Sequence, residues 1–394
     1  MIGVEEAHAR LQADNPVLVG DESVKLKNGL GRVLAADVVS DINVPPADNS
    51  AMDGYALRRE DWCGPDQALQ VSQRITAGTP PGVLREGTAA RIFTGAEIPD
   101  GADLVVMQEK CKTDGQSVLI EAVGDVGANI RPKGQDIYKG TTVLQAGHRL
   151  RAQDLGLIAS LGIARIDVRQ RLKVAIISTG EELVEPGDSA GPGQIYNSNR
   201  YTLATLLGGW GFEVIDFGIA ADDPDIISGV MTQASRETHV IITSGGVSVG
   251  EEDHVKAVVE SLGRIDLWRV AIKPGKPFAF GEVLGTPFLG LPGNPVAVLI
   301  TALVVARPFL FNCQGVRHHD VIPVRQTALF DKKGSARQEY LRIRSGSDGV
   351  EIFPQQSSGV LYSTCWGDGV VVQKPGEDIN HGDSVDVIPY VLFN

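Results

Sequence analysis

Cysteine is scarce in this sequence, and its spacing excludes two common kinds of site. The chain has four cysteines, Cys63, Cys111, Cys313 and Cys365. They stand far apart without a CxxC pair, which excludes the spacing of a zinc site and the framework of a disulfide-rich secreted domain. This usage suits a reducing compartment, so we expect buried or unreactive thiols and a cytoplasmic location.

Basic residues are outnumbered by acidic ones, which disfavours nucleic acid as a partner. The 36 lysines and arginines stand against 49 aspartates and glutamates, giving a formal net charge of −13 and a pI near 5.0. Such a chain repels phosphate backbones at long range. An anionic small molecule would therefore need locally clustered lysines and arginines.

Long hydrophobic runs are also missing, so we expect neither a secretory signal nor contact with a membrane. The residues after Met1, "IGVEEAHARLQ", bring acids early and lack the apolar core of a signal peptide. The most apolar segment, residues 296–306, falls well short of the roughly 20 residues that a membrane span needs. Because Pro295 and Arg307 flank this segment, we predict a buried core helix.

The composition that is present indicates a folded chain of several domains. Hydrophobic residues make up 43% of the 394 positions and charged residues 22%, which is typical of globular proteins. The length predicts about two to four domains. The expected fold class is multidomain α/β plus β: a β-rich N-terminal region over 1–170 with two subdomains (1–45 with 140–170, and 46–139), an α/β domain over 171–312, and a small C-terminal β-barrel over 313–394.

Alternating strands and helices in the middle region predict a doubly wound parallel sheet. The runs "KVAIIST", "EVIDFGIA", "HVIITS" and "PFLGLP" each lead into a polar turn, and most of these turns lead into a segment of helical length. This order is typical of parallel βαβ units with helices on both faces. Asp223 with Pro224, and Asn294 with Pro295, predict helix starts, since each pair is an N-cap followed by proline.

A glycine-rich loop follows the third of these predicted strands. Ligands of open parallel sheets bind beyond the carboxyl ends of the strands. The loop "TSGGVSVG" offers Gly245, Gly246, Ser248 and Gly250, whose backbone N–H groups can approach a phosphate closely. A plain glycine-rich turn explains the loop equally well, and its order matches neither a dinucleotide site nor a P-loop.

Carboxylates in the neighbouring loops suggest a divalent cation. Glu182, Asp222 and Asp253 would gather beside the glycine loop, where a cluster of like charges is costly unless a cation neutralises it. We therefore expect Mg²⁺ to bridge these carboxylates and a phosphate. Asp223 is expected only to cap its helix, and Glu181 to face water.

Two rigid turns carry positive charge. "AIKPGKPFAFG" places Lys273 and Lys276 three apart on a Pro-Gly turn, which holds both ammonium groups in place to offset the charge of a phosphorylated ligand. "NIRPKGQD" places Arg131 and Lys133 just before Asp136. For this second turn, a solvated charge run is an equally good interpretation.

One acid stands on an unusually sharp corner near the start of the chain. "DNSAMDGYAL", residues 48–57, opens with two turn formers and carries Asp53 directly before Gly54. Such a pair bends the chain and presents a carboxylate. We therefore treat Asp53 as a candidate functional residue.

Seven segments of the chain resemble a known family. They are "VPPADNSAMDGYAL", "RIFTGAEIPDGADLVVMQE", "NIRPKGQDI", "ISTGEELVEPG", "SGGVSVGEEDH", "AIKPGKPFAFG" and "GLPGNPVA". In this order they resemble the molybdopterin molybdenumtransferases, called MoeA in bacteria and similar to the C-terminal domain of gephyrin. The resemblance covers essentially the whole chain. Arg269 stands where the family often has lysine, and His254 where an aromatic residue is usual.

The resemblance implies the last step of molybdenum cofactor synthesis. Adenylylated molybdopterin would be bound, its pyrophosphate bond cleaved with a divalent cation, AMP released and molybdate placed on the dithiolene. A homodimer is also implied, with the active cleft between the middle domain of one subunit and the Asp53 region of the other. The molybdopterin adenylyltransferase is a further expected partner.

The resemblance also implies which residues act. The catalytic set would consist of two acids and a threonine near the dithiolene, three acids near the metal, and two lysines. These residues are Asp53, Thr94, Asp136, Glu182, Asp222, Asp253, Lys273 and Lys276. Of these, Glu182, Asp222 and Asp253 would contact the metal, water or ribose. Substrate binding would fall to Gly245, Gly246, Ser248, Gly250, Pro292, Asn294 and Ser358.

Three other functions stay open at this point. Insertion of tungstate instead of molybdate is one, since both oxyanions are tetrahedral dianions of nearly equal size. A non-catalytic molybdopterin-binding or scaffold module would bind nucleotide without hydrolysis. Adenylyl transfer to molybdopterin would consume ATP, although the β-rich flanks and Asp53 argue against it.

Overall fold

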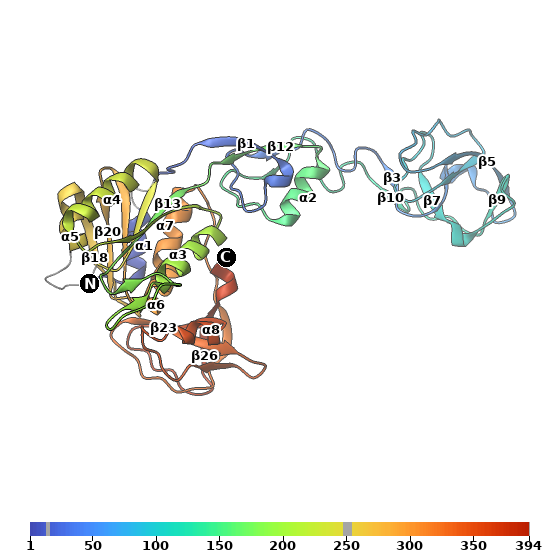
Figure 1. The fold of residues 1–394 in the computed structure, drawn as a ribbon. Helices are drawn as coiled ribbons and strands as arrows, with labels where there is room; N and C mark the ends of the chain where they lie inside the picture. Colours follow the sequence, from blue (N-terminus) through green and yellow to red (C-terminus); the bar gives the residue numbers. More distant parts are fainter. Residues whose placement is uncertain (13–15, 247–253, 394) are drawn as a thin grey trace. The chain divides into compact units, whose positions relative to one another are not determined.

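The computed structural model describes residues 1–12, 16–246 and 254–393. The chain divides into two compact units. The main unit comprises Met1–Ala36, Ala146–Arg151 and Arg165–Asn394, and the inserted unit comprises Asp37–Gln145 and Ala152–Ala164. Each is described by itself below, with the element labels of Figure 1.

The core of the main unit is a six-stranded sheet in the order β16-β13-β17-β21-β20-β18. Four of its strands are the predicted ones and run parallel: β13 (Lys173–Thr179), β16 (Glu213–Ala220), β17 (Val240–Ser244) and β21 (Thr286–Leu291). Because they are parallel, the loops that leave them meet at one edge of the sheet.

Two further strands extend the sheet in the antiparallel sense. β20 (Pro277–Val283) pairs with β21, and β18 (Gly263–Arg269) pairs with β20. Only Leu284 and Gly285 connect β20 to β21, and both have positive φ, 49° and 86°. A two-residue turn of this kind can join only antiparallel neighbours. The sheet is therefore mixed, with a parallel centre and an antiparallel edge.

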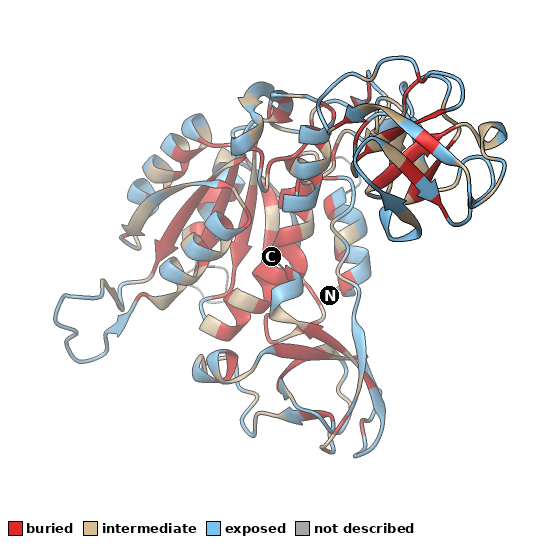
Figure 2. Ribbon diagram, turned by 90° about the vertical axis from the view of Figure 1, so that its right-hand side faces the viewer, coloured by how far each residue is buried: buried red, intermediate tan, exposed pale blue. Residues whose placement is uncertain are grey.

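Helices cover both faces of this sheet, as the sequence predicted. Val174 and Ile176 of β13 pack in the cluster that contains Leu203 of α3 (Ser198–Gly209). Ala175 and Ile177 pack instead in the cluster of α4 (Pro224–Glu237) and α5 (His254–Leu262). This alternation follows from the two-residue period of a strand. Figure 2 shows buried residues along the strands and exposed residues on the outer sides of the helices.

The helix starts follow their capping signals. The Asp223 carboxylate accepts hydrogen bonds from the N–H groups of Asp225 (2.9 Å) and Ile226 (3.1 Å), so it caps α4 as predicted. Asn197 caps α3 by accepting from Arg200 N–H. Asn294 occupies the cap position of α6 (Pro295–Thr301), but its side chain makes no capping bond within the described residues.

The apolar segment forms a core helix. α6 continues through the π-helical turn η4 (Ala302–Ala306) into α7 (Arg307–Cys313). This continuous helix, Pro295–Cys313, is the one helix among the described residues that is long and apolar enough to cross a membrane, and 83% of its apolar window is buried inside the protein. The prediction of a buried core helix is confirmed.

The C-terminal part is a small, nearly closed barrel. Its strand order is β19-β23-β25-β26-β22, with β24 paired to β23. Ala328, just after β22, bridges to Val350 at the start of β24 and so joins the two ends. The strands are β19 (Ile272–Lys273), β22 (Val324–Thr327), β23 (Gln338–Ser345), β24 (Val350–Ile352), β25 (Gly369–Gln373) and β26 (Ser384–Pro389), followed by η5 (Tyr390–Phe393). β19 comes from the α/β region, so this sheet is continuous with it.

The chain ends of the main unit pack on the same core. α1 (Val4–Gln12) buries Val4, Ala7 and Leu11 in the cluster that also holds α7. The Trp210 ring is fully buried, and its Nε1–H donates to the carbonyl of Phe393 at 2.6 Å. Smaller pairs complete the unit: β1 (Asp21–Lys25) with β12 (Arg165–Arg169), and β14 (Leu183–Val184) with β15 (Ile195–Tyr196).

The inserted unit is built on a second six-stranded sheet, as the β-rich sequence predicted. The order is β7-β4-β6-β5-β9-β8. The strands are β4 (Gly54–Leu57), β5 (Ala68–Ile75), β6 (Thr88–Ile92), β7 (Leu104–Met107), β8 (Cys111–Thr113) and β9 (Ser117–Ile120). Gly54 lies so close to the neighbouring strand that a Cβ would meet the carbonyl oxygen of Val106 at 1.9 Å, which explains why glycine follows Asp53.

Short elements complete the inserted unit. β2 (Val38–Val39) pairs with β11 (Thr142–Leu144), and β3 (Asn49–Ser50) pairs with β10 (Ile130–Arg131). The helix α2 spans Ala152–Ser160. The chain then turns at Gly162, whose φ of 77° is left-handed, as expected for a glycine that ends a helix.

Candidate active site

A large pocket opens at the carboxyl edge of the parallel strands in the main unit. Its volume is about 1020 Å³, at the upper limit of ordinary ligand pockets. The loops after all four parallel strands line it, together with the turn after β19 and the segment before α8 (Tyr362–Trp366) of the barrel. The position is the one that the parallel-sheet rule predicted.

Nine of the predicted site residues line this pocket. They are Glu182, Asp222, Gly245, Gly246, Lys273, Lys276, Pro292, Asn294 and Ser358. Three more, Asp53, Thr94 and Asp136, belong to the inserted unit. The remaining three, Ser248, Gly250 and Asp253, lie outside the described residues.

The first half of the glycine loop is held tightly against its neighbours. Gly245 and Gly246 have left-handed φ of 93° and 64°. A Cβ on Gly245 would meet the Thr179 carbonyl oxygen at 2.6 Å, and one on Gly246 would meet Val255 Cγ2 at 2.3 Å. The Gly245 N–H donates to the carbonyl of Leu291 at 3.2 Å. The Gly245 N–H can therefore donate to a phosphate, as predicted, only if its hydrogen bond to Leu291 breaks.

Three buried polar atoms in the pocket wall have no partner among the described residues. They are Thr179 Oγ1, Asn199 Oδ1 and Asn197 Nδ2. The Asn199 amide nitrogen donates to Ser244 Oγ (3.0 Å) and to the carbonyl of Gly293 (2.7 Å). Asn199 thus ties together the loops after β17 and β21, and its oxygen is available to a hydrogen-bond donor on a ligand.

Among the described residues, the acids that line this pocket are Glu182 and Asp222, and Glu182 is exposed. Within the described residues no group of three His, Cys, Asp or Glu side chains could hold a metal ion. Mg²⁺ in phosphate sites usually has one or two carboxylates and takes its other ligands from water and substrate phosphates. The donor set present fits an ion of that kind.

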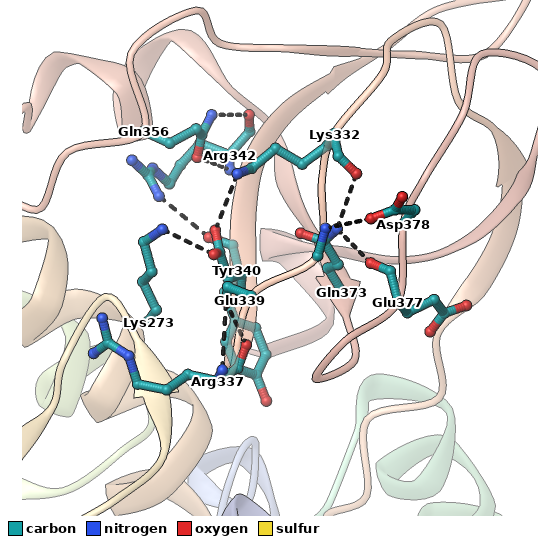
Figure 3. A network of polar contacts seen from close by, with 12 residues as sticks. Lys273, Lys332, Arg337, Glu339, Tyr340, Arg342, Gln356, Gln373, Glu377 and Asp378 are labelled. Atoms are coloured by element: carbon teal, nitrogen blue, oxygen red, sulfur yellow. Dashed lines mark hydrogen bonds and ion pairs between the residues drawn. The ribbon is translucent and has the colours of Figure 1, made fainter.

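The two predicted lysines lie on a tightly packed turn. A Cβ on Gly275, between Lys273 and Lys276, would meet Thr301 Cγ2 of α6 at 2.5 Å. Lys276 is exposed, whereas Lys273 is half-buried. Lys273 Nζ lies 2.8 Å from the Glu339 carboxylate, whose other oxygen lies 3.6 Å from Lys332 Nζ (Figure 3).

Sequence reasoning missed the buried charges of β23. Glu339 and Arg342 are both about 1% exposed. The Arg342 guanidinium donates at 3.2 Å to the carbonyls of Tyr340 and Ser357 and to Ser363 Oγ, and burial lowers its pKa to about 10. A Glu and an Arg within the otherwise apolar run "EYLRI" were the available signal, since buried charges need partners.

In the inserted unit, the structure brings Asp53 and Thr94 together. Asp53 Oδ1 accepts hydrogen bonds from the N–H and the Oγ1 of Thr94, both at 2.7 Å. These bonds, with a smaller effect of the Arg91 charge, hold the pKa of Asp53 below its ordinary value. Asp136 is exposed, and its N–H donates to the carbonyl of Val44.

Cationic side chains surround the ring that precedes Thr94. The guanidinium carbons of Arg74 and Arg91 lie 4.7 and 4.6 Å from the centroid of Phe93. Arg91 also donates to the carbonyl of Gly54 and to the side chain of Gln108. Arg91 therefore brings a positive charge to the surroundings of Asp53.

This combination defines a class: a multidomain α/β and β protein with a ligand pocket at the strand ends of its α/β domain. Three family models match in order: the MoeA N-terminal region (domains I and II) over residues 2–162, a probable molybdopterin binding domain over 175–312, and the MoeA C-terminal region (domain IV) over 330–390. The chain belongs to the MoeA family of molybdopterin molybdenumtransferases.

Individual relatives are similar in sequence to this chain over most of their lengths. The molybdopterin molybdenumtransferase of Haemophilus influenzae is 36% identical, with 99% of each chain covered. That of Nostoc sp. is 40% identical over 75% of this chain and 70% of its own. A solved structure of the molybdopterin biosynthesis MoeA protein of Pyrococcus horikoshii is 32% identical, covers 100% of this chain and 99% of its own, and superposes with a TM-score of 0.83.

Proposed function

We propose that this protein inserts molybdate into adenylylated molybdopterin, with Mg²⁺-dependent cleavage of the adenylate and release of AMP, in the cytoplasm. The observation that carries the proposal is the single pocket in which Glu182, Asp222, Lys273 and Lys276 meet at the strand ends. It combines groups for a metal-bound phosphate with groups for an oxyanion. Membership of the MoeA family supports the substrate class.

The lysines provide positive charge for the anions of the reaction. Lys276 is exposed at the pocket, so its ammonium group can move together with a phosphate or molybdate oxygen. The ammonium group of Lys273, by contrast, is held in an ion pair with Glu339. Charge held in place ahead of the reaction stabilises charge that develops in the transition state without reorganisation. Asn199 Oδ1 and Thr179 Oγ1 would accept hydrogen bonds from the ligand.

Glu182 and Asp222 would hold Mg²⁺ together with oxygens of the substrate. Bound there, the ion would supply a Lewis acid that polarises the pyrophosphate bond. The two carboxylates would also orient the attacking water or the ribose hydroxyls. Asp253, outside the described residues, is proposed as a third contributor.

Asp53, Thr94 and Asp136 are proposed to act at the dithiolene end, from the second subunit of a homodimer. The supporting observation is chemical: two hydrogen bonds from Thr94 keep the Asp53 carboxylate ionised and oriented. An oriented carboxylate can accept a proton from a thiol or a molybdate-bound water. Contact with the molybdopterin adenylyltransferase, which would hand over the substrate, belongs to the same proposal.

The test is a reconstitution with purified protein, Mg²⁺, adenylylated molybdopterin and molybdate. We expect stoichiometric release of AMP and formation of active cofactor, measured by activation of an apo-molybdoenzyme. Glu182→Gln should lower the rate about 100-fold, while Glu181→Gln, at the adjacent exposed acid outside the pocket, should match the wild type.

Each alternative has its own outcome in that reconstitution. Nucleotide binding without AMP release would indicate a scaffold module, and ATP consumption with free molybdopterin would indicate adenylyl transfer. A strong preference for tungstate in competition would indicate a tungsten-inserting enzyme. Equal rates for Glu182→Gln and the wild type would contradict the assigned pocket.

A further inference from the structure

Glu339 is a nearly buried carboxylate that faces two lysines. Its side chain is 2% exposed. Oε1 lies 2.8 Å from Lys273 Nζ and Oε2 lies 3.6 Å from Lys332 Nζ, so each oxygen has its own cation. Figure 3 shows the two lysines approaching this carboxylate from different segments of the chain.

Burial of this group is costly and needs compensation. Burial by itself raises the pKa of Glu339, but hydrogen bonds from Lys273 and Ser335 and the charges of both lysines outweigh it, so the pKa lies below its ordinary value. Glu339 is therefore ionised at neutral pH. A buried carboxylate with two partners is held more rigidly than a surface ion pair.

Backbone contacts place Glu339 beside the pocket turn. β19 and β23 pair in parallel with Lys273 opposite Glu339. The Gln338 N–H donates to the carbonyl of Ala271 (3.1 Å), and Arg337 Nη1 donates to the carbonyl of Ile272 (3.1 Å). Pairing with β23 thus fixes the backbone position of Lys273, and the ion pair with the Glu339 carboxylate fixes the position of its ammonium group.

The two lysines differ in their relation to the pocket. Lys273 lines the pocket and its side chain is 38% exposed, whereas Lys332 lies outside the pocket lining and is 27% exposed. Removal of Lys332 would leave the Lys273–Glu339 pair in place. Lys332 therefore offers a control that disturbs the same network without touching the pocket.

We propose that Glu339 is a positioning residue, which holds the Lys273 ammonium group at one point of the pocket wall for the reacting anion. The proposal rests on the function proposed above. Lysine has a flexible four-carbon stem, so without its anchor the ammonium group would sample many positions. Loss of fixed geometry lowers the rate of the reaction more than it lowers ground-state binding. The buried negative charge also limits how strongly Lys273 binds the anionic ground state.

The first test separates kcat from KM. For Glu339→Gln we expect kcat for AMP release to fall about 10- to 100-fold, while KM for adenylylated molybdopterin stays within about threefold or decreases. Glu339→Asp, which keeps the charge with a shorter reach, should recover part of kcat. Lys332→Met should keep kcat within about threefold of the wild type. Urea unfolding of all variants measures any structural loss.

The second test does not depend on activity. An amine-reactive reagent, with labelling of each lysine quantified by mass spectrometry, reports whether Lys273 Nζ is held. We expect Glu339→Gln to increase labelling of Lys273 severalfold and to leave Lys276 unchanged, whereas Lys332→Met should not increase labelling of Lys273.

The outcomes distinguish the two proposals. A wild-type protein that releases no AMP would overturn the proposed function and, with it, the catalytic meaning of the positioning, while labelling would still decide whether Glu339 holds Lys273. Wild-type kcat in Glu339→Gln, or equal losses of kcat in Glu339→Gln and Lys332→Met, would overturn the positioning role. Unchanged labelling of Lys273 in Glu339→Gln would do the same.

Discussion

Asp53 Oδ1 accepts two hydrogen bonds of 2.7 Å from a single residue, Thr94, one from its N–H and one from its hydroxyl group. The two residues are 41 positions apart in the sequence. Asp53 directly precedes β4 and Thr94 follows β6, and these two strands belong to the same sheet of the inserted unit. Both bonds favour the ionised carboxylate. The pKa of Asp53 is lowered for this reason, not because of burial, which acts in the opposite direction.

Thr94→Val should therefore raise the pKa of Asp53 toward its ordinary value of 3.8. In the wild type the pKa lies below 3.8, so the stabilisation of the folded state by this group is present above pH 3.8 and is lost as the pH falls through the folded pKa. Carbon-detected NMR titration of the Asp53 carboxyl group measures the shift. Thr94→Ser, which retains the hydroxyl, should titrate as the wild type, and an unshifted midpoint in Thr94→Val would refute the assignment.

Substitution of Gly246 should damage the pocket loop, whereas substitution of a helical glycine should not. Gly246→Ala places a Cβ 2.3 Å from Val255 Cγ2 at a φ of 64°, so we expect a loss of more than about 1 kcal/mol of unfolding free energy and weaker nucleotide binding. Gly229→Ala in α4 has open space around the new methyl group. It should stabilise the protein by about 0.4–1 kcal/mol. Urea denaturation compares the two, and equal effects would argue against the tight loop geometry.

Stability should fall as the pH drops below 6.5, in part because of His239. Its Nδ1 accepts a hydrogen bond from the Lys173 N–H at 2.9 Å, which requires an unprotonated Nδ1. Burial, followed by the Lys173 charge, lowers the pKa of His239 below 6.5. The unfolded chain thus binds more protons just below pH 6.5, so the contribution of His239 is complete above this pH and declines toward the folded pKa.

His239→Gln removes this titration while retaining a hydrogen-bond acceptor. We expect its unfolding free energy to decrease less between pH 7 and pH 5 than that of the wild type. His319, which is also half-buried and has a lowered pKa, should keep part of the pH dependence in both proteins. Identical pH dependence of the two would show that His239 does not contribute.

Asn199 should matter for ligand binding as well as for stability. Asn199→Ala removes the two bonds that join the loops after β17 and β21 and removes the buried, unpartnered Oδ1. The ligand hydrogen bond lost at Oδ1 is worth about 0.5–1.5 kcal/mol, so we expect AMP affinity by calorimetry to fall about tenfold. Loss of the two bonds between the loops should also lower the unfolding free energy. Thr205→Ala, on an exposed part of the same helix, should bind AMP as the wild type does. Equal affinities for all three proteins would exclude Asn199 from the binding site.

Local signals in the sequence predicted the centre of the fold and much of the pocket. Asp223 with Pro224 predicts the start of α4 because capping depends on three or four consecutive residues. Glu182, Asp222 and Gly246 could be placed together because parallel strands bring their following loops to one edge. These inferences require no knowledge of distant contacts.

Distant contacts account for what sequence reasoning did not find. Glu339 meets Lys273 across 66 positions, and their pairing depends on a barrel strand adding to β19. The antiparallel edge depends on the turn Leu284–Gly285, which lacks the Asn-Gly or Asp-Gly signal of such hairpins. The Gly245 N–H bond to Leu291 depends on the neighbouring strand, which periodicity along one segment does not reveal.

The most direct measurement is a crystal structure of the protein with adenylylated molybdopterin bound. We predict the pyrophosphate in the 1020 Å³ pocket, with its oxygens within hydrogen-bonding distance of Gly246 N–H or of the ammonium groups of Lys273 and Lys276. Ligand density elsewhere, with the pocket between the glycine loop and these lysines occupied by water alone, would contradict the account.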